Sequence, residues 1–164
     1  MKQEADKVIY LDNNATTRLA EEVLEEMLPY LKQWYGNASS MHSFGGRLRH
    51  QIDRARQQVA ALLGCAPDEV IFTSGGTESD NTAIRGVLGQ HPDKRHIITT
   101  RVEHPAVRSP CRLLQKQGYR LTELGVDRYG RLDLEALREA LTDDTVLVSV
   151  MYANNHTGVM FPLE

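Results

Sequence analysis

Hydrophobic positions along the chain alternate between a helical spacing and short β-branched runs. The clearest helical spacing runs from Leu48 to Leu62, where apolar residues recur every three or four positions. Gly64 follows at the position typical of a helix end. Leu24 and Leu31 belong to the apolar face of an earlier predicted helix. The first 64 residues are therefore expected to be mainly helical after a polar start.

Beyond residue 64, strand-like runs alternate with helical segments. The predicted strands are residues 70–73, 96–100, 119–124 and 146–152, and the predicted helices are residues 78–88, 105–117 and 134–141. This alternation is typical of an α/β fold with a mostly parallel sheet flanked by helices. In such a sheet, ligands bind beyond the carboxyl ends of the strands. The loops that follow strands are therefore where we expect chemistry.

Composition and charge narrow the class of protein. A chain of 164 residues with 41% hydrophobic side chains is long enough for one domain with an ordinary core. Its 19 basic and 22 acidic residues are interspersed, so we expect no nucleic-acid partner. No apolar run approaches the roughly 18 residues of a membrane span, and the polar start is unlike a signal peptide. Cys65 and Cys111 form no metal-ligand spacing and no disulfide framework, so a cytoplasmic protein without a metal or membrane is expected.

The most informative segment is the loop in which the first β-branched run stops. Gly75 and Gly76 follow that run directly, and Thr77 opens the next helix. Glycines let the backbone approach a ligand closely, and the N–H groups of a first helical turn lack partners in the helix. The segment therefore predicts a seat for an anion such as phosphate. The same residues also fit a plain tight turn with Thr77 as the N-cap.

Two later loops that follow predicted strands also carry polar side chains. His104 stands before Pro105, a residue favoured at the first position of a helix, so its imidazole is expected at a helix start. Taken alone, His104 is better explained as a capping residue, but its coincidence with the anion seat favours a functional role. The last loop contains Asn154, Asn155 and His156. We expect all three loops to open onto the same edge of the sheet.

Five motifs in the chain resemble those of the cysteine desulfurases, close to the NifS type. They are YLDNNATT from Tyr10, GNASSMH from Gly36, FTSGGTES from Phe72, VEHPAV from Val102 and VMYANN from Val150. The similarity runs from about Val8 to the last residue. It implies the large domain of the aspartate-aminotransferase fold, which is fold type I of the pyridoxal 5′-phosphate enzymes. Residues 1–20 would be an N-terminal arm, and residues 21–164 the first part of the cofactor-binding domain.

The family resemblance also implies an activity and a set of residues. Members of the family are homodimers that take sulfur from L-cysteine, leave L-alanine and pass an enzyme persulfide to an iron–sulfur scaffold protein. By position, Gly76 and Thr77 would hold the cofactor phosphate. His104 would lie against the pyridine ring and handle protons near the substrate amine, while Asn155 would face the phenolic oxygen. Asn37 would belong to the substrate-side loop, although a turn asparagine beside a glycine explains it nearly as well.

Pyridoxal chemistry also requires a lysine that bonds the cofactor and an acid on the pyridinium nitrogen. The lysines are Lys2, Lys7, Lys32, Lys94 and Lys116, and none is predicted to follow a strand in a site-facing loop. The persulfide cysteine has no evident counterpart either. Cys111 shares core spacing with Val107 and Leu114, and Cys65 follows a helix end, so both are expected to be buried. The chain thus resembles the first part of a longer enzyme and is expected to be inactive alone.

Two positions depart from the family pattern. Family members usually have Glu where His156 stands, which puts in doubt any role that needs a fixed negative charge there. They usually have Pro where Ala38 stands, which loosens a loop. Two alternatives to a cysteine desulfurase remain. One is another fold-type-I enzyme, such as a selenocysteine lyase or a class V aminotransferase, and the other is a non-catalytic truncated binding or dimerisation module.

Overall fold

The structure is a computed structural model that describes residues 8–163. It divides into two compact units, residues 1–72 and residues 73–164, which are described separately. Lys2, Lys7 and the first seven residues of the predicted arm lie outside the described residues. The assignment of residues 1–20 to an arm stays a prediction.

The first unit is helical, as its apolar spacing predicts. It contains α1 (Glu21–Lys32), α2 (Ser43–Leu63) and a short 3₁₀ turn, η1 (Pro67–Glu69). At the start of α2, the N–H of Gly45 donates to His42 Nδ1 at 3.2 Å. Gly64 ends α2 in the left-handed conformation with φ 71°, which glycine adopts without strain. The predicted helix and its glycine stop are therefore both confirmed.

The predicted strand at residues 70–73 does not form. A strand exists only when a neighbouring strand takes its backbone groups, and no described segment pairs with these residues. Instead, the guanidinium of Arg56 on α2 donates to the carbonyl oxygen of Val70. The same guanidinium lies 4.9 Å from the centre of the Phe72 ring. The β-branched residues here indicate a propensity for strand, but in this chain a side chain satisfies the backbone.

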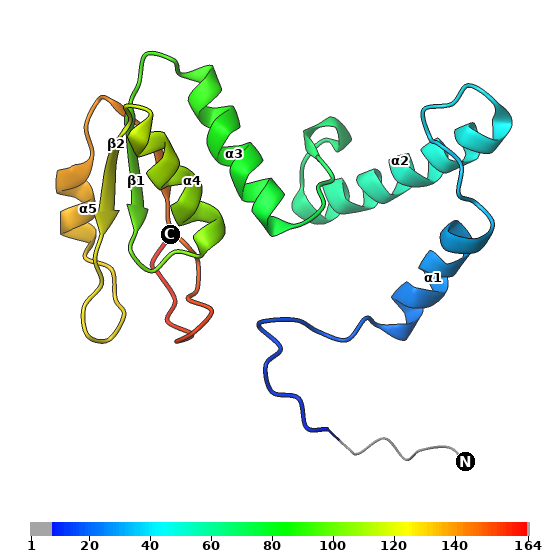
Figure 1. Cartoon of the computed structure of the whole chain (residues 1–164), viewed down its shortest axis with the longest axis horizontal. Coiled ribbons are helices and arrows are strands. Elements are labelled where there is room, and N and C mark those ends of the chain that lie inside the picture. The colour runs from blue at the N-terminus through cyan, green and yellow to red at the C-terminus, as the bar shows by residue number, and fades with distance from the viewer. Residues whose placement is uncertain (1–7, 164) are drawn as a thin grey trace. The chain divides into compact units, whose positions relative to one another are not determined.

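The second unit is a parallel α/β sheet with helices on both faces (Figure 1). Its elements are α3 (Gly76–Gln90), β1 (His96–Thr100), α4 (Pro105–Lys116), β2 (Arg120–Leu124), α5 (Leu134–Ala140) and β3 (Thr145–Ser149). The strand order is β2-β1-β3, and β1 pairs in parallel with both neighbours. The predicted fold class is confirmed. β3 ends before the predicted boundary because the N–H of Met151 donates to the Glu103 carboxylate instead of a strand.

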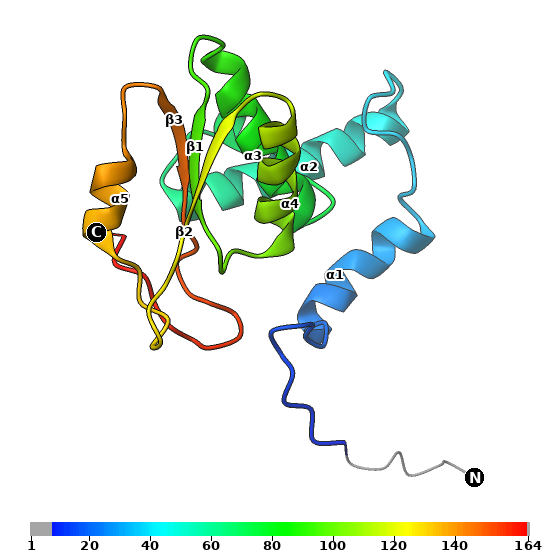
Figure 2. The same ribbon diagram turned by 60° about the vertical axis from the view of Figure 1, so that its left-hand side comes forward.

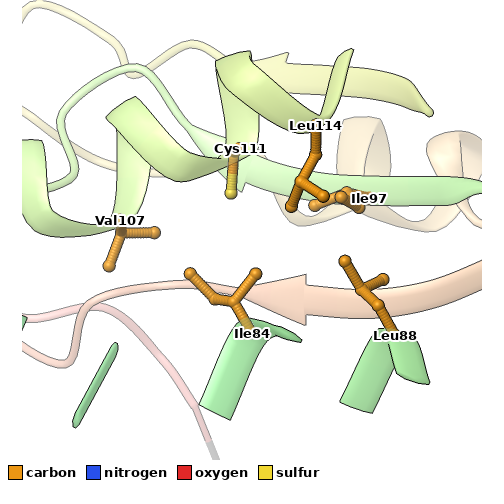
Figure 3. Packing of buried hydrophobic residues seen from close by; sticks show 6 residues of the cluster. All are labelled: Ile84, Leu88, Ile97, Val107, Cys111 and Leu114. Atoms are coloured by element: carbon orange, nitrogen blue, oxygen red, sulfur yellow. The ribbon is translucent and has the colours of Figure 1, made fainter. Parts of the chain in front are cut away.

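The hydrophobic core of this unit lies on both faces of β1. Helices α3 and α4 cover one face, and α5 covers the other (Figure 2). The first cluster consists of Ile84, Leu88, Ile97, Val107, Cys111 and Leu114 (Figure 3). The second consists of Ile98, Leu124, Leu132 and Phe161. Because each face is covered, β1 is buried along its whole length.

A buried histidine fastens the amino end of the sheet. His96 is fully buried, and its Nδ1 lies 2.8 Å from Thr145 Oγ1 on β3. Its Nε2 lies 2.9 Å from Thr122 Oγ1 on β2. Both ring nitrogens are thus satisfied by hydroxyl groups, which accept or donate as the tautomer requires. This end of the sheet is structural, whereas the loops at the carboxyl end carry the candidate site.

Membrane-spanning helices and clusters of metal ligands are both absent from the part of the chain that the structure describes. None of the helices there is long and apolar enough to cross a membrane. Within residues 8–163, no group of three or more His, Cys, Asp or Glu side chains is arranged to hold a metal ion.

Candidate active site

A cavity of about 450 Å³ lies between the start of α3 and the start of α4. Its lining residues are Thr77, Asn81, Arg85, His104, Pro105, Ala106, Ser109, Pro110 and Leu113. Two of the predicted site residues, Thr77 and His104, therefore meet in one cavity although they come from different helices. The amide of Asn81 also reaches across, since its Nδ2 donates to the carbonyl oxygens of Thr77 at 2.9 Å and Ala106 at 3.5 Å.

The first turn of α3 has the geometry of an anion seat. The first helical hydrogen bond runs from the N–H of Ser79 to the Gly75 carbonyl at 3.1 Å. Among the described residues, no acceptor takes the N–H of Gly76, Thr77 or Glu78. A Cβ at Gly76 would meet no atom within 4 Å, so the space beside the turn is open. Three donors at a helix start are the donor set that a phosphate requires.

The N-cap of α3 is Gly75, and Thr77 is the second residue of the helix. The alternative interpretation of Thr77 as the N-cap is therefore wrong, because the helix begins two residues earlier than that role requires. Glu78 stands beside the seat, but its carboxylate is engaged by the N–H of Ser74 at 2.6 Å. That hydrogen bond lowers the pKa of Glu78.

His104 is the N-cap of α4, as its position before Pro105 predicts. Its Nδ1 accepts a hydrogen bond from the N–H of Ala106 at 3.1 Å, and the side chain is exposed. Because Nδ1 is the acceptor, the neutral imidazole carries its proton on Nε2. The free nitrogen of this ring is therefore a proton donor in the neutral state.

Asn155 lies in the loop after β3 and is exposed. This loop and the loop that carries His104 leave the same edge of the sheet, because β1 and β3 are parallel. Asn155 does not line the cavity shared by Thr77 and His104 in the described chain. The structure thus places Asn155 at the expected edge but outside that cavity.

Asn37 lies in the first unit, in the loop between α1 and α2. Its Oδ1 accepts a hydrogen bond from the N–H of Ser39 at 2.8 Å, which is the geometry of an Asx turn. The next residue, Ala38, has its carbonyl oxygen bonded by Arg49 Nε at 3.1 Å. The local structure therefore explains Asn37 as a turn residue, and its role near the substrate stays a prediction.

A second cavity, of about 460 Å³, contains a residue that sequence reasoning missed. Glu103 lines it together with Arg101, Arg108, Asn154 and His156. Only 6% of Glu103 is exposed, and its carboxylate accepts from the N–H of Met151. Burial raises the pKa of Glu103. Its one sequence signal is its place directly before His104, and hydropathy gives no reason to expect a buried carboxylate there.

Within the second unit, the described lysines and the cysteine lie away from the candidate site. Lys94 precedes β1 at the amino edge of the sheet, and Lys32 and Lys116 are the last residues of α1 and α4. No described lysine therefore follows a strand at the carboxyl edge. Cys111 is fully buried in the core, and burial raises the pKa of its thiol to about 11, as expected of a structural cysteine. Cys65, also expected to be buried, is only half-buried.

The chain belongs to the Aminotransferase class-V family, whose pattern matches residues 9–164. This is a pyridoxal-phosphate-dependent family. The donors at the start of α3 fit the phosphate of that cofactor, and the His104 ring supplies a flat surface in the same cavity.

Similar proteins include cysteine desulfurases. The chain is 58% identical over 157 residues to the cysteine desulfurase of Trichormus azollae, covering 96% of this chain and 39% of that protein. It is 52% identical to the cysteine desulfurase NifS of Azotobacter vinelandii, covering 95% of this chain and 39% of that protein. Among solved structures, a NifS-like protein has a TM-score of 0.89 at 41% identity, covering 94% of this chain and 43% of the other. A solved structure of SspA in complex with cysteine has a TM-score of 0.88 at 33% identity, covering 94% of this chain and 45% of that one.

The chain therefore spans about two fifths of the length of these relatives, since it covers 39% of the cysteine desulfurase of Trichormus azollae.

Proposed function

We propose that this chain is the cofactor-cradling part of a cysteine desulfurase, which converts L-cysteine to L-alanine and transfers the sulfur. The observation that carries the proposal is the cavity in which the open first turn of α3 meets His104. It occurs in a chain more than half identical to proteins named cysteine desulfurase. Resemblance and local chemistry thus support the same function.

The start of α3 would hold the cofactor. The N–H groups of Gly76 and Thr77 would donate to the phosphate, and the Thr77 hydroxyl adds a further donor. The positive end of the α3 dipole favours the same negative charge. When bound, pyridoxal phosphate supplies an electron sink, which accepts the electrons released as a bond of the substrate breaks.

His104 and Asn155 would serve the ring and the substrate side. With Nδ1 bonded to the N–H of Ala106, His104 has Nε2 available to give or take a proton near the substrate amine. Its ring would lie against the pyridine ring. Asn155 would place an amide beside the phenolic oxygen, and Asn37 would belong to the substrate-side loop. These roles are the ones that the resemblance of the chain's motifs to the family implies.

The proposed enzyme is larger than this chain. Among the described residues of the second unit, the lysine that bonds the cofactor and the persulfide cysteine have no counterpart near the candidate site. The 164 residues are therefore proposed to be inactive alone. The whole enzyme is proposed to be a cytoplasmic homodimer that hands sulfur to an iron–sulfur scaffold protein.

A chimera tests this proposal. Residues 1–164 are joined to the remaining part of NifS from Azotobacter vinelandii, with which the chain is 52% identical. Alanine and sulfide formed from L-cysteine are then measured. We expect turnover that His104→Ala lowers by about 100-fold, the order of a lost proton-transfer group. His91→Ala, which changes an exposed histidine at the far end of α3, serves as the matched control. A folded chimera that binds pyridoxal phosphate but forms no alanine would contradict the proposal.

A further inference from the structure

We propose that Glu103 and Asn154 are positioning residues that fasten the loop of His104 to the loop of Asn155. This inference rests on the proposed function of those two neighbours. The first loop supplies two acceptors, the Glu103 carboxylate and the Val102 carbonyl oxygen. The second supplies two donors, the N–H of Met151 and the amide of Asn154. We call this pair of hydrogen bonds the loop clasp.

The burial of Glu103 requires an explanation. Glutamate is almost never fully buried unless it is paired, because removing a carboxylate from water is costly. Only 6% of Glu103 is exposed, at the end of the loop that follows β1. Its carboxylate oxygen accepts a hydrogen bond from the N–H of Met151, the second residue after β3. An apolar residue would fill the space at lower cost, so the hydrogen bond across the two loops is what the carboxylate provides.

Asn154 organises the other half of the clasp. Its Oδ1 accepts from the N–H groups of His156 and Thr157, each at 3.0 Å. Its Nδ2 is turned the other way and donates to the Val102 carbonyl at 3.3 Å. One side chain therefore shapes its own loop and ties that loop to the neighbouring one.

The clasp frames the two proposed site residues in sequence. His104 directly follows Glu103, and Asn155 directly follows Asn154. Site residues lose efficiency when they are displaced by as little as about 1 Å, so they need support from residues that do not touch the ligand. A competing explanation is that Glu103 acts through its charge on His104. Side-chain length and charge can be varied separately to distinguish these explanations.

The test is amide hydrogen exchange of the 164-residue chain, read by mass spectrometry over residues 150–157. Glu103→Gln keeps the length and the acceptor but removes the charge. Glu103→Asp keeps the charge but shortens the reach. We expect Glu103→Asp and Glu103→Ala to exchange about tenfold faster in this segment, the order expected for a lost bond to a carboxylate. Glu103→Gln should stay within about twofold of the wild type, as should the control Glu139→Gln, an exposed carboxylate on α5.

Asn154→Ala tests the second hydrogen bond. We expect faster exchange over residues 101–104, while residues 96–100 of the buried strand keep their protection. If Glu103→Ala loses protection in residues 96–100 as well, this variant has unfolded. The comparison of Glu103→Gln with Glu103→Asp then decides whether the clasp exists. Two results would overturn the clasp. One is slow exchange of residues 150–157 in Glu103→Asp together with fast exchange in Glu103→Gln. The other is unchanged exchange of these residues in every Glu103 variant.

Equilibrium dialysis with pyridoxal phosphate connects the clasp to the site. We expect Glu103→Asp to bind the cofactor severalfold more weakly than Glu103→Gln, because a loosened His104 loop offers a poorer surface. Equal binding by the two variants, with exchange altered as expected, would overturn the positioning role. Absence of binding by the wild-type chain would count against the proposed function, while the exchange measurement still decides the clasp.

Discussion

Ile97 and Ile98 are consecutive residues of β1, and both are completely buried, because they point to opposite faces of a sheet that is covered on both sides. Ile97 packs in the cluster with α3 and α4, and Ile98 packs in the cluster on the α5 side. One strand thus joins two separate parts of the core.

We predict that Ile97→Ala and Ile98→Ala each lower the free energy of unfolding by about 2–5 kcal/mol, the usual cost of such a truncation in a core. Urea denaturation checks this. Val148→Ala on the neighbouring strand β3 is the control, since 40% of that side chain is exposed and the loss should be smaller. An equally small loss at either isoleucine would mean that the face of the sheet to which it points is open.

Thr77→Ala should weaken pyridoxal phosphate binding by about three- to thirtyfold, because it removes a hydroxyl that lines the cavity at the start of α3. Equilibrium dialysis measures the dissociation constant. Thr82→Ala removes an equivalent hydroxyl from an exposed position of the same helix and should leave binding unchanged. Equal effects of Thr77→Ala and Thr82→Ala on the dissociation constant would contradict a cofactor site at the start of α3.

The 164-residue chain alone should not desulfurate L-cysteine, because none of its described lysines is in a loop that directly follows a strand of the sheet. Purified chain is incubated with pyridoxal phosphate, cysteine and a thiol, and sulfide and alanine are assayed. We expect no more product than the free cofactor gives. Turnover well above that background would show that a lysine or nucleophile of this chain had been overlooked.

Cys111 should resist alkylation in the folded chain, whereas Cys65 should react. Cys111 is fully buried and burial raises the pKa of its thiol to about 11, so almost no thiolate forms at pH 8. Cys65 is half-buried and is therefore open to reagent. Iodoacetamide at pH 8 followed by mass spectrometry should modify Cys111 only after denaturation. The Cys65→Ser variant isolates the Cys111 signal, and rapid labelling of that variant would contradict the buried thiol.

His96 should make stability depend on pH. Burial lowers the pKa of its imidazole, with Arg120 acting in the same direction and Asp144 opposing it. In the unfolded chain the pKa of this imidazole is about 6.5. As the pH falls below that value, the unfolded state therefore binds more protons than the folded state. Stability from this residue is complete above that pH and is lost as the pH falls toward the lowered folded pKa.

Thermal unfolding between about pH 5 and pH 8 tests this sign. We expect His96→Gln to be less stable than the wild type at pH 8, because it loses hydrogen bonds to two strands. Between pH 8 and pH 5, however, its stability should fall less than that of the wild type. His91→Gln, at an exposed position, should follow the wild-type curve. A wild type whose stability rises as the pH is lowered from 7 to 5 would contradict the prediction, provided that the His91→Gln variant behaves in the same way.

Residue patterns alone predict much of the fold and part of the candidate site. The helices, the strands at His96 and Arg120 and the helix start at His104 follow from apolar spacing, from Gly64 and from Pro105. These features are local, because spacing, caps and the ring of proline act within a few residues of the chain. The family motifs are local as well, so the resemblance to the cysteine desulfurases is visible in the amino-acid sequence alone.

Tertiary structure decides the rest. Residues 70–73 have the propensity of a strand, yet Arg56 takes the Val70 carbonyl and no described strand pairs with them. The buried Glu103 and the early end of β3 share one cause, the hydrogen bond from Met151, whose partners are far apart in the sequence. Spacing along a chain carries no information on such pairings, because they depend on which backbone groups the fold brings within reach.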